Sequence, residues 1–247
     1  MLELENISFE VSEEDDSKEI VKDMSLKLED GKFIVITGPN GGGKSTLAKV
    51  IAGIHKPTSG KIYFEGEDIT QKSVTERAKL GIAYGFQQPV RFKGITVRDL
   101  ICLAAGKKLS VAESCEYLAE VGLCAKDYID REVNASLSGG ELKRVEIATV
   151  LARGSKLSVF DEPEAGIDLW SFQNLIKVFE NMRKTNRQGS ILVISHQERI
   201  LNIADEIVVI ADGEIVKQGG KEEVLPTLVS TEAMASKCNK YNMGGES

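Results

Sequence analysis

The sequence contains few of the residues that build metal clusters and disulfide frameworks. Among 247 residues there are four cysteines and two histidines. No two of the cysteines stand in the Cys-x-x-Cys spacing that is typical of a cysteine-bound metal. We therefore expect these cysteines to be buried or incidental thiols in a reducing compartment. The composition gives little support to a metal site that depends on cysteine or histidine.

The chain also lacks long apolar runs and an excess of basic charge. A run such as residues 207–211 is far shorter than the roughly 20 residues that cross a bilayer. The opening residues 2–5 (Leu-Glu-Leu-Glu) have neither the basic end nor the apolar stretch of a signal peptide. The net charge of −7 argues against a broad electrostatic contact with nucleic acid or an anionic membrane. We expect a soluble, cytoplasmic protein that neither binds nucleic acid nor inserts into a membrane.

The distribution of apolar residues predicts an α/β fold. Some segments alternate apolar and polar residues, as strands with one exposed face do. Others are short and continuously apolar, as strands covered by helices on both faces are. From about residue 95 to residue 136 the pattern changes to helical segments, which predicts an inserted helical subdomain. The alternating segments are residues 2–11 and 20–28, and the continuous ones are residues 33–36, 157–160, 191–194 and 207–210.

A glycine-rich segment at residues 38–46 predicts a phosphate-binding loop. It reads Gly-Pro-Asn-Gly-Gly-Gly-Lys-Ser-Thr, follows the apolar run at residues 33–36 and opens into a helical pattern. Its glycines let backbone N–H groups surround a phosphate, and the helix N-terminus attracts the same charge. Lys44 would contact the β- and γ-phosphates of a nucleoside triphosphate, and Ser45 would bind Mg²⁺. The predicted nucleotide-binding residues are Gly38, Asn40, Gly41, Gly43, Lys44, Ser45 and Thr46.

Two carboxylates follow the apolar run at residues 157–160. At the end of a buried strand beside a phosphate-binding loop, a carboxylate is well placed to bind Mg²⁺. Asp161 would bind the metal, directly or through water, together with Ser45. Glu162 would polarise the water that attacks the γ-phosphate. The alternative is that both are surface carboxylates in a turn before Pro163.

Residues 137–141 (Leu-Ser-Gly-Gly-Glu) predict a second phosphate-binding site. Ser138 and two glycines precede a helical pattern, so the backbone can approach an anion closely and the helix N-terminus faces it. Taken alone, the segment is also a capped helix, with Glu141 at the capping-box spacing from Ser138. Because the first loop already holds one nucleotide, we expect Ser138 and Gly140 to face the nucleotide of a second copy of the chain.

Together these motifs resemble the ATP-binding cassette family, over about residues 2–219. The matches are the Walker A motif at residues 38–45, the Q-loop glutamine at Gln87, the signature at residues 137–141, the Walker B motif at residues 157–162, the D-loop at residues 165–168 and the switch histidine at His196. In that family two cassettes enclose two ATP molecules head to tail, and each signature completes the other cassette's site. The resemblance implies an ATPase that converts ATP and water to ADP and phosphate, and that forms an ATP-dependent homodimer.

The resemblance also implies a fold and its division along the chain. It implies a P-loop NTPase of ATP-binding cassette type, in which the α/β core carries an antiparallel β subdomain and an inserted helical subdomain. On this basis residues 1–94 and 137–247 form the nucleotide-binding core with the β subdomain. Residues 95–136 form the helical insertion, and the whole chain is one cassette domain.

Hydrolysis is the role that the resemblance implies for three side chains. Glu162, His196 and Gln87 would be catalytic, with Gln87 contacting Mg²⁺ and water and His196 contacting the γ-phosphate. Asp168 would link the two nucleotide sites across the dimer interface. One departure from the family is Val11, which lies where many cassettes have an aromatic residue that stacks on adenine. The base would therefore be held weakly or by other residues.

Local sequence favours one subgroup of cassettes. Residues 195–201 (Ser-His-Gln-Glu-Arg-Ile-Leu) and 86–90 (Phe-Gln-Gln-Pro-Val) resemble the SufC-type ATPases of iron–sulfur cluster assembly. Transporter cassettes usually place an aspartate directly after the histidine, although Thr96-Val97 resembles their sequences. The alternative is therefore the ATPase subunit of a membrane transporter. Cassettes of DNA repair and translation fit less well, because they carry a coiled-coil insertion or a second cassette.

The SufC resemblance implies a partner and a regulatory contact. The partner would be a SufB-like scaffold, which is deformed when the cassettes dimerise on ATP; in the alternative it would be the transporter's membrane subunit. Residues 90–94 would form the docking face, unless Phe92 packs in the core. Lys143 would pair with Glu162 in the free monomer and lower its activity.

Overall fold

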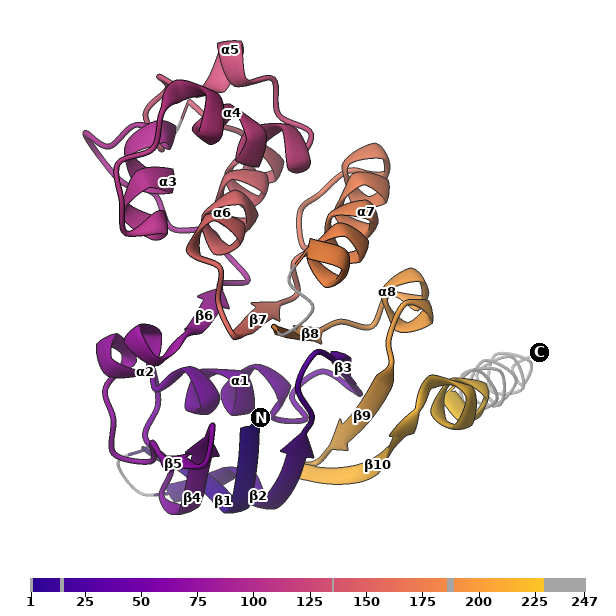
Figure 1. The fold of residues 1–247 in the computed structure, drawn as a ribbon. Helices are drawn as coiled ribbons and strands as arrows, with labels where there is room; N and C mark the ends of the chain where they lie inside the picture. The colour runs from indigo at the N-terminus through magenta and orange to yellow at the C-terminus, as the bar shows by residue number, and fades with distance from the viewer. Residues whose placement is uncertain (1, 14–15, 135, 186–188, 229–247) are drawn as a thin grey trace, which may run out of the picture.

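The structure, a computed structural model, describes residues 2–13, 16–134, 136–185 and 189–228. Within them the chain forms two sheets and the helices that cover them (Figure 1). The strands are β1 (Leu2–Glu13), β2 (Asp16–Leu28), β3 (Phe33–Thr37), β4 (Ser59–Phe64), β5 (Glu67–Asp68), β6 (Ile82–Gly85), β7 (Leu157–Asp161), β8 (Ser190–Ile194), β9 (Glu206–Ala211) and β10 (Glu214–Gly220). The helices are α1 (Lys44–Ala52), α2 (Val74–Leu80), α3 (Val97–Ala105), α4 (Val111–Glu120), α5 (Ala125–Tyr128), α6 (Gly139–Arg153), α7 (Leu169–Thr185) and α8 (Glu198–Asn202).

The smaller sheet is antiparallel, with the strand order β2-β1-β4-β5. Its strands alternate buried and accessible residues: on β1, Leu2 and Leu4 are buried whereas Glu3 and Glu5 are accessible. The register shifts between Leu4 and Ile7, and Ile7 is buried despite its odd number. A bulge of this kind bends the strand and lets both segments place their apolar side chains on the same face. The predicted antiparallel sheet is confirmed.

The larger sheet is mixed, with the strand order β10-β9-β3-β8-β7-β6. All neighbouring pairs from β9 to β6 are parallel, and β10 is antiparallel to β9. Every residue of β3, β7 and β8 is buried, as expected of strands that are covered on both faces. Phe33 and Val35 belong to the core on one face of this sheet, and Ile34 and Ile36 to the core on the other.

Helix α1 lies between the two sheets (Figure 1). Leu47 and Val50 of α1 share one core with apolar residues of both sheets. The opposite face of the larger sheet is covered by α6, α7 and α8. This arrangement, with α1 between the sheets and further helices on the far face of the larger sheet, is the predicted α/β fold with the antiparallel sheet that the family resemblance implies.

Helices α3, α4 and α5 fall within residues 95–136. Val97 of α3 and Leu118 of α4 belong to the same core as Val35 of the central strand. The predicted boundaries of the helical insertion, at residues 94/95 and 136/137, stay a prediction because this core is continuous across them. None of the described helices has the length and apolarity that crossing a membrane requires. Cys102 and Cys115 are half-buried and Cys124 is exposed, while Cys238 lies outside the described residues.

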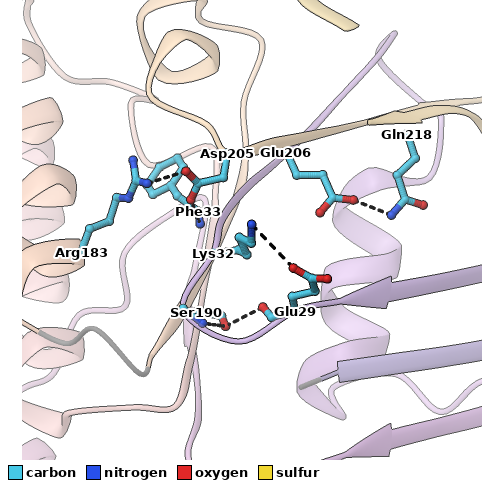
Figure 2. Close-up of polar contacts among 9 residues, drawn as sticks. Glu29, Lys32, Phe33, Arg183, Ser190, Asp205, Glu206 and Gln218 are labelled. Carbon is cyan, nitrogen blue, oxygen red and sulfur yellow. Dashed lines mark hydrogen bonds and ion pairs between the residues drawn. The ribbon is translucent and has the colours of Figure 1, made fainter. Parts of the chain in front are cut away.

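Polar contacts hold the amino end of β3 (Figure 2). Asp205 accepts a hydrogen bond of 2.8 Å from the backbone N–H of Phe33. It also forms an ion pair of 2.5 Å with Arg183 of α7. The hydroxyl of Ser190, at the start of β8, donates to the carbonyl of Glu29 in the turn before β3. The two bonds to the Asp205 carboxylate are charge-assisted and therefore stronger than neutral hydrogen bonds. They fix the start of the central strand, and therefore the position of the loop at its other end.

Candidate functional site

The predicted site residues follow four neighbouring parallel strands of the larger sheet. The phosphate-binding loop follows β3, His196 follows β8, Glu162 follows β7 and Gln87 follows β6. The carboxyl ends of parallel strands lie at one edge of a sheet, which is where open α/β sheets bind ligands. Residues that are far apart in the sequence are therefore brought together at one edge.

Two glycines of the phosphate-binding loop, Gly38 and Gly43, are required by close backbone contacts. Gly38 has φ of 133°, and a Cβ atom there would lie 1.9 Å from the carbonyl oxygen of Ile210. Gly43 has φ of 96°, and a Cβ atom there would lie 2.6 Å from the carbonyl oxygen of Ile20. Both a positive φ and a contact this short exclude a side chain. The loop is thus packed against β2 and β9, while Asn40 and Gly41 at its tip are exposed.

Lys44 lies at the start of α1, with its ammonium group held inside the loop. Its Nζ donates hydrogen bonds of 2.8 Å to the carbonyls of Gly38 and Pro39. Burial lowers the pKa of Lys44, and the carboxylates of Glu162 and Asp161 counteract that shift in part. A cation within a glycine loop at the N-terminus of α1 makes this a site for an anion such as a phosphate.

Ser45 and Asp161 meet directly. The Ser45 hydroxyl donates a hydrogen bond of 2.8 Å to Oδ1 of Asp161, and the hydroxyl of Tyr84 donates one of 2.9 Å to Oδ2. Burial and the contact with Asp161 raise the pKa of Tyr84, so its hydroxyl stays protonated and acts as a donor. A hydroxyl and a carboxylate at this distance are hard oxygen donors of the kind that Mg²⁺ prefers. These residues therefore fit the predicted metal.

Glu162 is held by the predicted Q-loop residue. Nε2 of Gln87 donates a hydrogen bond of 2.6 Å to Oε2 of Glu162. Glu162 has φ of 43°. This left-handed conformation is unfavourable for any residue that has a side chain. The predicted pairing of Lys143 with Glu162 is wrong: Lys143 forms an ion pair of 3.0 Å with Glu146 instead, because both lie on one face of α6.

His196 is exposed and lies two residues after Ile194, the last residue of β8. Before it, the Ser195 hydroxyl donates a hydrogen bond of 2.5 Å to Oε1 of Glu164, which precedes the predicted D-loop. Burial raises the pKa of Glu164, while the bond from Ser195 counteracts the shift in part. The segment of His196 is therefore tied to the D-loop segment through Ser195 and Glu164.

The predicted signature forms the start of α6. Ser138 is its N-cap: the side chain accepts from the N–H of Glu141, and Glu141 accepts from the N–H of Ser138. The alternative interpretation, a capped helix, is thus present in the structure. It does not occupy the N–H groups of Gly139 and Gly140, so the segment can still bind an anion. A Cβ atom on Gly140 would lie 4.0 Å from the carbonyl oxygen of Gly166, so the signature and the D-loop adjoin.

Comparison with known proteins decides the family. The family model described as ABC transporter matches residues 21–165, more than half of the chain. The chain belongs to this family. It is an ATP-binding cassette, and as such it binds ATP together with Mg²⁺.

Two relatives and one solved structure illustrate the similarity of this cassette to known proteins. An uncharacterized ABC transporter ATP-binding protein, MJ0035 of Methanocaldococcus jannaschii, is 41% identical over 84% of this chain and 86% of its own. A probable ATP-dependent transporter of Antithamnion sp., ycf16, is 32% identical over 91% of this chain and 93% of its own. The dimeric structure of the cassette MJ0796 bound to ADP and phosphate superimposes with a TM-score of 0.81, at 23% identity, over 90% of this chain and 99% of its own. That likeness confirms the predicted fold.

Val11 is exposed at the position where the family resemblance predicts an aromatic residue. Val11 lies on the hairpin of β1 and β2, where it pairs with Lys18, and it is 40% exposed. Ile20 of the same hairpin contacts the phosphate-binding loop through its carbonyl oxygen. Phe9 does not replace the missing aromatic residue, because its ring stacks on His55 at 4.9 Å.

Sequence reasoning missed three residues of the cassette's site, namely Tyr84, Glu146 and Glu164. Tyr84 stands in an apolar strand pattern and reads as a core residue. Glu146 and Glu164 look like ordinary surface carboxylates in the sequence, yet both are largely buried and both contact a site loop. For Tyr84 the available signal was a hydroxyl within an apolar strand, since such a group is hydrogen-bonded when buried.

Proposed function

We propose that this cassette hydrolyses ATP as a head-to-tail homodimer and uses the resulting change in shape to drive a partner protein. The observation that carries this proposal is the juxtaposition of the metal-binding pair, Ser45 and Asp161, with Gln87 and Glu162 at one edge of the sheet. Phosphoryl transfer depends mostly on positioning and electrostatic stabilisation, and these residues provide both.

Each of these side chains has a role in the proposed reaction. Lys44 binds the β- and γ-phosphates, and Mg²⁺ held by Ser45 and Asp161 supplies further positive charge beside them. The carboxylate of Glu162 accepts a hydrogen bond from the attacking water and polarises it. Gln87 orients Glu162 and contacts the metal and the water, and His196 contacts the γ-phosphate.

The proposed dimer uses the exposed start of α6. Ser138 and Gly140 of one copy bind the γ-phosphate held by the other, and Asp168 links the two sites across the interface. Support comes from the free N–H groups of the signature and from its contact with the D-loop at Gly166. In a closed pair the phosphate is surrounded by donors on both sides, which strengthens electrostatic stabilisation.

The proposed docking surface is the apolar groove around Phe86. Phe86 is 38% exposed and Val90 and Val74 are each 46% exposed, although all three are apolar. Hollows of about 230 and 160 Å³ flank Phe86. Phe92 packs partly against the core and borders only the smaller hollow. Exposed apolar surface of this kind marks a contact with another protein, and it adjoins Gln87.

The partner that we propose is the membrane subunit of a transporter. Support comes from the relatives, which carry the names of transporter ATP-binding proteins. A second candidate is a SufB-like scaffold of iron–sulfur cluster assembly. It is favoured by residues 195–201 and 86–90, where Gln197 follows the histidine and Gln88-Pro89-Val90 follows the Q-loop glutamine.

Hydrolysis and dimerisation are tested together. We expect the purified protein to release phosphate from ATP with Mg²⁺. The Glu162→Gln variant should bind ATP, release phosphate at least about a hundredfold more slowly, and elute as a dimer from size exclusion with ATP. A fully active variant would remove Glu162 from the mechanism, and a monomer under all conditions would contradict the head-to-tail dimer.

The partner is tested by purification from native membranes and cytosol with a tagged chain. Recovery of an integral membrane protein supports the transporter candidate, and recovery of a soluble scaffold supports the second one. Val90→Glu should weaken either association, because it places a charge in the groove. The matched control is Val216→Glu, since Val216 is 59% exposed on β10, away from the groove. An equal effect of both variants would contradict docking at Phe86.

A further inference from the structure

A single ion pair on α6 binds both backbone polar groups of Phe86. The N–H of Phe86 donates a hydrogen bond of 2.8 Å to Oε1 of Glu146, and its carbonyl accepts a short hydrogen bond from Nζ of Lys143. Lys143 and Glu146 stand one turn apart, and Nζ lies 3.0 Å from Oε2 of Glu146. Phe86 directly precedes Gln87, so the pair fixes the backbone from which Gln87 extends.

This pair is buried, although a buried pair is costly. The side chain of Lys143 is 1% exposed and that of Glu146 is 13% exposed. Burial raises the pKa of Glu146, and Lys143 counteracts that shift only in part. Two apolar residues of similar volume would usually stabilise a fold at least as much as such a pair does. The pair is thus poorly explained by stability, whereas its charge-assisted bonds to one loop residue give precise geometry.

The same helix carries the signature. Lys143 lies five positions after Ser138, the N-cap of α6, so the two residues are joined by little more than one turn of helix. A helix moves as a rigid element, and interaction with a second copy at Ser138 would therefore reach Phe86 through Lys143 and Glu146. From Phe86 the connection continues to Gln87, whose Nε2 lies 2.6 Å from Oε2 of Glu162.

We propose that Lys143 and Glu146 are positioning residues for hydrolysis. They hold Gln87 against Glu162, and they make this contact depend on the position of the signature helix. The inference rests on the proposed hydrolysis of ATP and adds two residues that contact neither nucleotide nor metal. Their effect passes through Gln87, which is the property that an experiment can isolate.

The test is a double-mutant cycle on ATP hydrolysis. Lys143→Met combined with Glu146→Gln removes both buried charges, while the amide oxygen at position 146 can still accept from Phe86. We expect kcat to fall about tenfold or more and KM for ATP to change less than about twofold, because the phosphate-binding loop is untouched. In a chain that carries Gln87→Ala, the same double substitution should lower kcat less than about twofold.

The control and the contrary outcomes follow from the same cycle. Lys72→Met with Glu67→Gln removes a more accessible ion pair of 3.0 Å and should leave kcat unchanged in both backgrounds. Equal losses with and without Gln87 would overturn the inference, because a purely structural defect acts independently of Gln87. If the double variant does not fold, Lys143→Arg, which keeps both charges but alters the geometry of the bond to Phe86, should give a smaller loss that again disappears with Gln87→Ala. An active wild-type protein with an unaffected variant overturns this inference only; an inactive wild-type protein overturns the proposed function and this inference with it.

Discussion

The hydroxyl of Ser45 lies 2.8 Å from Oδ1 of Asp161, although 116 positions separate the two residues in the chain. Ser45 is at the first turn of α1 and Asp161 is the last residue of β7. The contact closes the predicted metal site with two oxygen donors. It also makes the site depend on strands that are not adjacent in the sheet, since β8 lies between β3 and β7.

Loss of the Asp161 carboxylate should impair Mg²⁺ binding and therefore ATP hydrolysis. Asp161→Asn removes the charge that binds Mg²⁺, and we expect kcat for ATP hydrolysis to fall at least about a hundredfold. Chelation of Mg²⁺ should stop the wild-type reaction, and added Mg²⁺ should restore it. Ser158→Ala, on the same strand but away from the site, is the control for damage to β7. Hydrolysis by Asp161→Asn at the wild-type rate would contradict a role of this carboxylate in binding the metal.

The backbone at Glu162 should favour glycine. Its φ of 43° strains any residue with a Cβ atom, so Glu162→Gly should be more stable than Glu162→Ala by about 1 kcal/mol. Both variants lack the carboxylate, so the comparison isolates the backbone. At Glu116, in the middle of α4, the order should reverse, because glycine destabilises a helix by about 1 kcal/mol relative to alanine. Urea unfolding measures both differences, and the same order at both positions would disprove strain at Glu162.

Arg77 should be essential for stability. It is 1% exposed, and its guanidinium donates to the carbonyls of Val50 and Ile51 at the end of α1 and to that of Thr70. Burial lowers its pKa to about 10. Arg77→Met removes the hydrogen bonds that a buried guanidinium donates to these carbonyls and should lower the free energy of unfolding by about 3 kcal/mol or more. Arg153→Met removes one bond to Ala78 and should cost about 1 kcal/mol or less. Equal costs would contradict the special role of Arg77.

Stability should depend on pH through Glu164. Burial raises the pKa of this carboxyl above its ordinary value of 4.5, so ionisation is harder in the folded state than in the unfolded one. The free energy of unfolding should therefore decrease as the pH rises from about 4.5 through the raised pKa. Glu164→Gln keeps an acceptor for Ser195 and removes the ionisable group. The free energy of unfolding of this variant should therefore rise relative to that of the wild type as the pH increases over that interval. The control is Glu222→Gln, since the side chain of Glu222 is 94% exposed. The same pH dependence of the free energy of unfolding for the wild type and Glu164→Gln would contradict a raised pKa of Glu164.

An aromatic residue at position 11 should strengthen nucleotide binding. Val11 is exposed on the hairpin beside the phosphate-binding loop. Because one base–aromatic stack contributes about 1–3 kcal/mol, we expect Val11→Tyr to lower the Kd for ATP about tenfold. Val216→Tyr, on β10, should leave the Kd unchanged. An unchanged Kd for Val11→Tyr would show that the base does not lie against this hairpin.

Much of the fold was predictable because each element carries a local signal. The continuous apolar runs of β3, β7 and β8 and the alternation of β1 follow directly from which faces are covered. The glycines of residues 38–43 and the capping residue Ser138 likewise reveal their conformations through local chemistry. The wrong pairing of Lys143 arose because resemblance does not identify which of several nearby carboxylates a buried amine will contact.

The phosphate-binding loop, the α/β class and the candidate donors could be predicted from the sequence alone, since they depend on residue type and on spacing along the chain. The tertiary structure decided which donors meet: Tyr84 with Asp161, Gln87 with Glu162, and Lys143 with Glu146. These contacts form because parallel strands end at one edge of the sheet and because α6 packs against the Q-loop. Strand order and helix packing arise from burial of apolar surface over the whole chain, and no local stretch of sequence encodes them.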